Sequence, residues 1–138
     1  MNIIKTGDSR ELLKQLKSRS VNTVYFDPPF NSNRNYRLTS DKNSLGFDDI
    51  FVDDDEYTSL IDPMLEECSR VLTKDGSLFF HISADQMLIP HMLCSRYFKH
   101  VQPIFWKRSR SKNNIKTKLG ACTDIIFKCS NTKKPKFN

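Results

Sequence analysis

The sequence predicts an α/β fold in which strands and helices alternate around a mainly parallel sheet. Two short runs rich in β-branched and aromatic residues, 21–26 and 77–82, have the length and composition of buried strands. Between them, apolar residues recur at helical spacing over residues 57–72. A helix that joins two strands favours parallel pairing, with helices on both faces of the sheet and ligands at the carboxyl ends of the strands.

The first twenty residues predict a short strand and then a helix. Ile3 and Ile4 are the apolar residues of the strand. Asp8 can cap the helix, with Glu11 three residues later completing the capping pattern. The apolar face of this helix consists of Leu12, Leu13 and Leu16.

A long polar segment, residues 31–55, separates the strand that ends at Asp27 from the next helix. Connections of this length in a compact domain are usually functional, so we expect a mobile lid here. The acidic run at 53–56 favours the first turn of the next helix over a metal site, because carboxylates are stabilised there by the helix dipole.

The helix over 57–72 is the clearest element of the sequence. Pro63 within it implies either that Asp62 caps a helix beginning at Pro63 or that an earlier turn is kinked. Lys-Asp-Gly at 74–76 predicts a closing turn. The other predicted elements are a strand at 77–82, a weaker helix at 87–98 that Pro90 distorts, and strands at 101–106 and 123–128.

The composition indicates one soluble domain. The chain has 138 residues, 38% hydrophobic and 28% charged, which allows a core but is short for an enzyme with its own cofactor and substrate modules. It lacks both an apolar run of the eighteen or so residues that span a bilayer and an N-terminal secretory pattern. We therefore expect a cytoplasmic protein.

The four cysteines and three histidines do not predict a metal site. No C-x-x-C pair occurs, and the histidines have no spacing typical of zinc ligands. We expect reduced thiols in the core, no disulfides and no metal.

Charge is divided unevenly along the chain. Residues 1–95 contain 10 Lys and Arg against 15 Asp and Glu, a net charge of −5, whereas residues 96–138 carry +11. At 106–120, Trp106 and several basic residues are interleaved with Ser and Asn. Such a segment, with its basic loop at 107–120, is typical of contact with a polyanion. Residues 131–138 predict a flexible basic tail.

Asp-Pro-Pro-Phe, residues 27–30, ends a strand with chemistry suited to the exocyclic amine of a nucleobase. The lone pair of such an amine is delocalised into the ring. The Asp27 carboxylate and the Pro28 carbonyl could accept its two N–H groups, localise the lone pair and stabilise the charge that develops during attack on a methyl group. The prolines restrict the backbone that holds both acceptors, and Phe30 offers a surface for a flipped base.

Six segments in order resemble the amino-methylating DNA methyltransferases, which act on adenine N6 or cytosine N4. They are GDSRELLKQL, SVNTVYFDPPFNSNRNY, FDD, EECSRVLTKDGSLFFHI, PIFWKR and DIIFKCSN. Their order resembles the class whose catalytic half precedes its cofactor half. The resemblance implies an incomplete Rossmann-like fold of about five strands with flanking helices, S-adenosylmethionine as the methyl donor, and a place in restriction–modification.

The resemblance also implies roles for individual residues. Asp27, Pro28, Pro29 and Phe30 match the catalytic motif. Asp8 falls where such enzymes often contact the adenosine of the cofactor, which Asp27 would also approach; a helix cap explains Asp8 equally well. Contacts to double-stranded DNA would come from Asn31, Lys107, Arg108, Arg110, Lys112, Lys116 and Lys118.

The sequence departs from this family in its glycines. Gly7, Gly46, Gly76 and Gly120 are far apart, so the F-x-G-x-G turn that binds the methionine part of the cofactor is absent. LGACTDIIF also lacks the histidine that relatives often have before the last strand, which leaves Cys122 without a role. We expect residues 1–138 to form a catalytic half-domain whose cofactor half lies on a second chain or has been lost from the gene.

The favoured interpretation is methylation of adenine N6, because Asp rather than Ser precedes Pro-Pro. One alternative is a non-catalytic remnant that binds nucleic acid through the basic loop. Another is a methyltransferase for RNA bases or protein amides, against which the extension NSNRNY argues. His81 is expected to be a strand residue satisfied by a neighbour, since transfer from a sulfonium needs no strong base. Trp106 suits core packing as well as base stacking.

Overall fold

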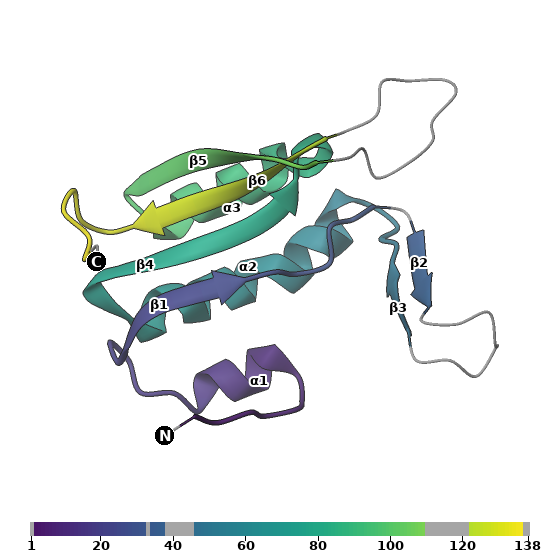
Figure 1. Ribbon diagram of the computed structural model, residues 1–138. Coiled ribbons are helices and arrows are strands. Elements are labelled where there is room, and N and C mark those ends of the chain that lie inside the picture. Colours follow the sequence, from purple (N-terminus) through teal and green to yellow (C-terminus); the bar gives the residue numbers. More distant parts are fainter. Residues whose placement is uncertain (1, 33, 38–45, 110–121, 137–138) are drawn as a thin grey trace.

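The computed structural model describes residues 2–32, 34–37, 46–109 and 122–136. It has a four-stranded sheet with helices packed against it and a separate two-stranded sheet (Figure 1). The elements in chain order are α1 (Ser9–Lys14), β1 (Val21–Phe26), β2 (Arg34–Arg37), β3 (Gly46–Asp49), α2 (Asp54–Val71), β4 (Leu72–Ser83), the 3-10 helix η1 (Ala84–Gln86), α3 (Leu88–Tyr97), β5 (His100–Lys107) and β6 (Thr123–Ser130).

The strand order is β1-β4-β6-β5, and the sheet is mixed rather than mainly parallel. Only β1 and β4 pair in parallel, through the α2 crossover, whereas β6 is antiparallel to both β4 and β5. The expectation of a mainly parallel sheet was wrong because it took no account of the connection from β5 to β6. No crossover helix was predicted in that segment, and strands joined without one favour antiparallel pairing.

The helices α2 and α3 lie together on one face of the sheet, behind the strands in Figure 1. Alternate residues of β4, Leu78, Phe80 and Ile82, are fully buried against this helical layer, as are Ile125 and Phe127 of β6. Tyr57, Ile61 and Leu65 of α2 complete the core. The expectation that helices cover both faces is therefore wrong for the described residues. The opposite face carries the alternate set of strand residues.

The N-terminal segment forms no strand at Ile3 and Ile4, contrary to expectation. Ile4 is 97% exposed, and no described strand lies beside it to supply hydrogen bonds. The short helix α1 follows and buries none of its residues. It is attached to α2 by Arg70, whose guanidinium donates to the backbone carbonyls of Leu13 and Leu16, each at 2.9 Å.

The polar stretch predicted as a lid contains an antiparallel hairpin in its described part. Arg34 of β2 pairs with Asp49 of β3, and residues 33 and 38–45 lie outside the described residues. Asp53 caps α2 by accepting the Glu56 N–H at 2.8 Å. Because that cap starts the helix nine residues before Pro63, the alternative of a helix beginning at Pro63 was wrong.

The predicted turn at 74–76 lies inside β4, where the pairing with β1 is irregular. Val21 pairs with Leu72 but Thr23 pairs with Ser77, so β4 bulges between these positions. A Cβ at Gly76 would lie 2.9 Å from the Asn22 carbonyl oxygen, which explains why glycine occupies the bulge. Pro90 lies in the first turn of α3, where a proline is tolerated. None of the described helices is both long and apolar enough for a membrane span.

Candidate active site

The carboxyl ends of β1, β4 and β5 meet the amino end of β6 at one end of the sheet (Figure 1). Strand register determines which side chains meet there. Phe26 pairs with Phe80, which brings the following residues, Asp27 and His81, beside each other. Trp106 pairs with Asp124 on the other side of β6. These four residues come from four strands or strand ends.

Asp27 points into solvent directly after β1, with 53% of its side chain exposed. Pro28 is buried and Pro29 is half-buried. Because neither proline has a backbone N–H, the strand stops here and the Asp27 carboxylate gains no local amide donor from the next two residues. Phe30 is half-buried against the core and meets His81 edge-on, with ring centroids 5.1 Å apart. The predicted catalytic tetrapeptide is therefore a rigid turn with an exposed acid.

The turn is held from the far side by Asp49, a residue that sequence reasoning missed. Asp49 is 1% exposed at the end of β3. Its carboxylate accepts the backbone N–H of Asn31 at 2.7 Å, the backbone N–H of Ser32 at 3.1 Å and the Ser32 hydroxyl. Asn31 has a left-handed φ of 55°, a conformation that asparagine tolerates better than most residues. The signal for Asp49 was its place in the FDD segment, which carried no assigned role.

His81 lies on the open face of the sheet between two carboxylates. Its Nδ1 atom is 3.2 Å from Asp27 Oδ1 and 3.0 Å from the Tyr25 hydroxyl, and its Nε2 atom is 3.3 Å from Asp124 Oδ2. The Trp106 ring lies 5.5 Å from the imidazole, centroid to centroid. The expectation that a neighbour satisfies His81 is confirmed at Nδ1, which is hydrogen-bonded with the Tyr25 hydroxyl.

Asp124 is also paired with Arg108, which follows β5. The Arg108 backbone N–H donates to the Cys122 carbonyl at 2.7 Å, so the two strand ends are tied together beside this pair. Polar side chains thus form a continuous chain from Arg108 through Asp124 and His81 to Asp27. This chain crosses the ends of all four strands of the sheet.

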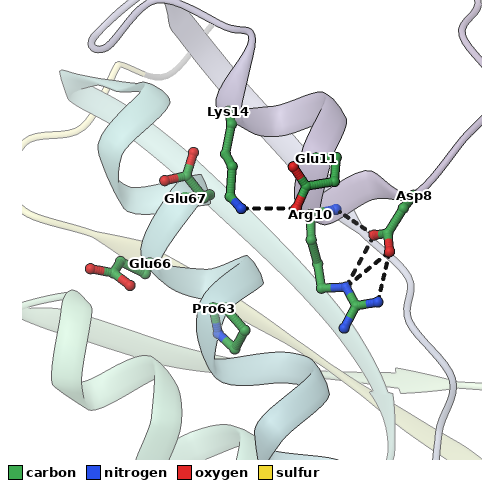
Figure 2. Close-up of a pocket in the computed structure, with 7 residues that line it drawn as sticks. All are labelled: Asp8, Arg10, Glu11, Lys14, Pro63, Glu66 and Glu67. Carbon is green, nitrogen blue, oxygen red and sulfur yellow. Dashed lines mark hydrogen bonds and ion pairs between the residues drawn. The ribbon is translucent and has the colours of Figure 1, made fainter.

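Asp8 lies elsewhere, at the start of α1. Its carboxylate accepts the Arg10 backbone N–H at 2.9 Å and pairs with the Arg10 guanidinium at 2.7 Å. The hydrogen bond from the Arg10 side chain is the main cause that lowers the Asp8 pKa from 3.8 to about 2. The helix cap suggested by the sequence is confirmed. Asp8 borders a cavity of about 450 Å³ between α1 and α2 (Figure 2).

The walls of that cavity are almost entirely charged. Figure 2 shows Arg10 turned toward Asp8 and Lys14 toward Glu11, with Glu66 and Glu67 on the facing helix. Pro63 supplies an apolar surface from α2, and no aromatic side chain lines the cavity among the described residues. Its size suits a small molecule, but sites for flat rings are usually lined by apolar and aromatic groups.

The predicted DNA-contacting residues fall into two sets. Lys107 and Trp106 are exposed at the end of β5, and Asn31 and Arg108 are half-buried beside Asp27 and Asp124. Arg110, Lys112, Lys116 and Lys118 lie outside the described residues, as does most of the predicted basic loop. Within the described part of the chain, no group of His, Cys, Asp or Glu is arranged to hold a metal ion.

The chain is similar in sequence to bacterial DNA methyltransferases. The DNA adenine methyltransferase YhdJ of Escherichia coli K12 is 26% identical over 121 residues, which cover 88% of this chain and 38% of YhdJ. The type II methyltransferase M.HinfI of Haemophilus influenzae is 28% identical and is matched over 99% of this chain and 40% of its own length. The chain thus spans about two fifths of these relatives.

Solved structures share the fold. The cytosine-N4-specific PvuII DNA methyltransferase superposes with a TM-score of 0.67 at 18% identity, covering 96% of this chain and 50% of that protein. The complex of M1.HpyAVI with SAM gives a TM-score of 0.59 at 17% identity, with 96% and 54% coverage. These likenesses establish an incomplete Rossmann-like methyltransferase fold. The family model for DNA methylases of the N6 and N4 type matches residues 21–138, and the chain therefore belongs to this DNA methylase family.

Proposed function

We propose that this chain supplies the catalytic half of an enzyme that transfers a methyl group from S-adenosylmethionine to the exocyclic amine of a base in double-stranded DNA. The observation that carries the proposal is the exposed Asp27 carboxylate on a rigid Pro-Pro turn at the end of the sheet. Membership of the DNA methylase family supports DNA as the substrate.

The chemistry must overcome the weak nucleophilicity of an aromatic amine. Its lone pair is shared with the ring, and transfer of a methyl group to it creates positive charge on nitrogen. We propose that Asp27 and the Pro28 carbonyl accept its two N–H groups, so the developing charge meets acceptors that are already in place. When bound, the cofactor supplies the electrophilic methyl group.

We propose Phe30 as the surface that receives the extruded base, with Pro29 holding the turn. Base extrusion costs a few kcal/mol, and stacking on an aromatic ring returns about 1–3 kcal/mol. The hydrogen bonds to Asp27 and Pro28 must supply the remainder. Trp106 lies nearby across His81 and offers a second ring at the same end of the sheet.

We propose that the described residues supply only part of the cofactor site. The cavity beside Asp8 has room for part of such a molecule, but its charged walls do not suit an adenine ring. For Asp8 we propose contact with the ribose, which requires a hydroxyl to compete with the Arg10 guanidinium for the carboxylate. Asp27 would approach the cofactor from the side of the base. No step of the chemistry above depends on either contact.

We propose that a further segment, on a second chain or in additional sequence, pairs with β1 and supplies the remaining cofactor walls. Among the described residues β1 pairs only with β4, so one edge of it presents unpaired backbone groups. Tyr25 on this strand and Ile3 and Ile4 before it are exposed. In this proposal residues 1–138 form a half-domain, with a flexible tail at 131–138.

For DNA contact we propose the residues that flank Asp27 and Trp106. Asn31 borders the turn and Lys107 lies at the end of β5. Arg108, which is paired with Asp124 beside them, would place a guanidinium near the phosphates. The basic segment would add Arg110, Lys112, Lys116 and Lys118. About five phosphate contacts give a slope near −4.5 for log affinity against log salt.

The favoured base is adenine, because an Asp precedes Pro-Pro in this chain. YhdJ is an adenine methyltransferase and PvuII is specific for cytosine N4, so relatives of both kinds exist. The type II relatives suggest a role in restriction–modification. We further propose a cytoplasmic location, where the DNA substrate would be.

The test joins this chain to the remaining portion of M.HinfI and measures transfer of labelled methyl groups to duplex DNA, with the methylated nucleoside identified by chromatography. We expect N6-methyladenine, and a loss of at least about 10²-fold in kcat for Asp27→Ala with DNA affinity retained. Asp75→Ala, at the other end of β4, is the matched control and should keep full activity. Undiminished transfer by Asp27→Ala would remove Asp27 from the mechanism. DNA binding with no transfer by the joined protein would favour the non-catalytic remnant.

A further inference from the structure

His81 is a buried histidine whose two ring nitrogens both face carboxylates. Its side chain is 10% exposed. The Nδ1 atom is 3.2 Å from Asp27 Oδ1, and the Nε2 atom is 3.3 Å from Asp124 Oδ2. No sequence motif connects these residues, and the proposed transfer does not by itself require a histidine.

The charged and titratable groups around His81 come from each neighbouring strand. Tyr25 and Asp27 face it from β1, Asp124 faces it from β6, and Arg108 after β5 is paired with Asp124. Phe30 and Trp106 contact the ring without charge. Among the described residues, these two carboxylates and one guanidinium leave one negative charge in excess, which an imidazolium balances.

The number of protons on the ring decides which carboxylates it can bind. A carboxylate only accepts hydrogen bonds, and a neutral imidazole has one N–H to donate. With that proton on Nε2, the N–H of the ring faces Asp124. The Nδ1 lone pair then accepts a hydrogen bond from the Tyr25 hydroxyl, so Asp27 Oδ1 faces a lone pair instead of a proton. With both nitrogens protonated, the Nε2 proton faces Asp124, and the Nδ1 proton faces Asp27 together with the Tyr25 oxygen.

We propose that His81, in its doubly protonated form, is a positioning residue that holds the Asp27 carboxylate in the orientation that receives the target amine. Oδ1 of Asp27 is engaged by the ring, and Oδ2 is left to accept the amine N–H. When the ring loses its Nδ1 proton, the Tyr25 hydroxyl becomes the donor to that nitrogen and Asp27 is released. This inference deepens the proposed function and rests on it.

The test follows the ring nitrogens of His81 by ¹⁵N–¹H nuclear magnetic resonance in the 138-residue chain from pH 5 to pH 9, with His81→Gln used to assign the signals. We expect both nitrogens to be protonated at the acidic end. In Asp27→Asn the midpoint of the His81 titration should fall by about one pH unit, the lower end of the effect of an opposite charge at this distance, since Asp27 is half exposed. The signals of His91 and His100 serve as internal references.

Asp75→Asn is the matched control. It removes a carboxylate from the same strand, six residues before His81. Ser77, two residues nearer to His81 than Asp75, is already about 13 Å away along β4. This is beyond the screening length at physiological salt, so the midpoint should stay in place. Because Asp27 is half exposed, Asp27→Asn should keep the backbone amide spectrum of the folded chain.

An unchanged His81 midpoint in Asp27→Asn overturns the inference, whether or not the joined enzyme methylates DNA. A lowered midpoint together with absent transfer keeps the contact and instead overturns the proposed function. In an active joined enzyme, His81→Gln should lower kcat about tenfold or more at unchanged KM for DNA, and should abolish the decline of kcat as pH rises through the His81 midpoint. A parallel loss of kcat at all pH values, with the decline retained, contradicts the positioning role.

Discussion

At the scale of the residue, two aspartates that follow strand-like segments differ in how available their carboxylates are, because different residues follow them in the chain. Asp8 precedes Ser-Arg-Glu, whose free amides begin a helix, and the cap and Arg10 occupy its carboxylate. Asp27 precedes two prolines without N–H groups, so its carboxylate stays half exposed and available to more distant partners.

The Asp8 carboxyl should titrate well below the ordinary value. Its pKa is lowered to about 2, first by the Arg10 side chain and then by the Arg10 backbone N–H. Since the folded pKa is depressed, the contribution of the charged cap is complete above about pH 4 and is lost as pH falls through about 2. Carboxyl ¹³C chemical shifts measure this.

Two variants test which side chain lowers the Asp8 pKa. Arg10→Gln should return the Asp8 pKa toward 3.8, whereas Lys14→Gln, which removes the smallest of the causes, should leave it near 2. Titration of Asp8 near 3.8 in the unmodified chain would contradict the paired carboxylate seen in Figure 2.

Residues tied to local sequence were predictable, and residues tied by strand register were not. The cap at Asp8 and the exposed acid at Asp27 follow from their immediate neighbours. His81 meets Tyr25 and Asp27 only because β1 and β4 pair in a particular register, with a bulge between them. Asp49 reaches Asn31 across a hairpin whose strands are short and polar, a pattern that gives no alternation of apolar residues.

At the scale of the element, α2 illustrates a reliable prediction and the start of β4 a failed one. The apolar spacing over 57–72 located α2 because its buried face includes Tyr57, Ile61 and Leu65. Lys-Asp-Gly at 74–76 has the composition of a turn, but the chain passes through it as a bulged strand beside Asn22. Backbone proximity between strands is not encoded in local composition.

Gly76→Ala should destabilise the fold. The added Cβ would lie 2.9 Å from the Asn22 carbonyl oxygen and 3.0 Å from a Leu72 methyl group, so the β1–β4 pairing must shift. We expect a loss of about 1–3 kcal/mol in the free energy of unfolding, measured by urea titration. The exposed neighbour Asp75→Ala should change stability by no more than about 0.5 kcal/mol. Equal stability of both variants would contradict the tight approach at Gly76.

At the scale of the whole molecule, a sheet covered by helices on one side divides the cysteines by environment. Cys68, Cys94 and Cys129 are buried in the core between the sheet and the helices, while Cys122 is exposed before β6. Burial raises the pKa of the Cys68 thiol to about 12. A hydrogen bond with Cys129, together with burial, also raises the pKa of the Cys94 thiol.

Alkylation should therefore distinguish Cys122 from the other thiols. Because the thiolate is the reactive form, iodoacetamide at pH 8 should label Cys122 in the folded chain and the three core cysteines only after unfolding. Peptide mass spectrometry measures the rates, and Cys122→Ser should leave the folded chain almost unlabelled. Labelling of Cys68 as fast as Cys122 would show that the core opens readily.

The overall arrangement was the least predictable part. Alternation of helix and strand indicated the α/β class correctly. The mixed pairing, and the face that none of the described helices covers, depend on how β6 inserts between β4 and β5. The position of β6 in the sheet buries Ile125 and Phe127 against α2 and α3. Because these contacts join residues far apart in the sequence, no local sequence pattern predicts them.

Within the described part of the chain one edge of β1 is unpaired, and this has a practical consequence for the chain on its own. The strand VNTVYF contains no charged residue, proline or glycine that would discourage docking of another extended segment. When no other segment pairs with that edge, the purified chain presents a template for self-association. We therefore expect the chain to be less soluble alone than with a strand paired to β1.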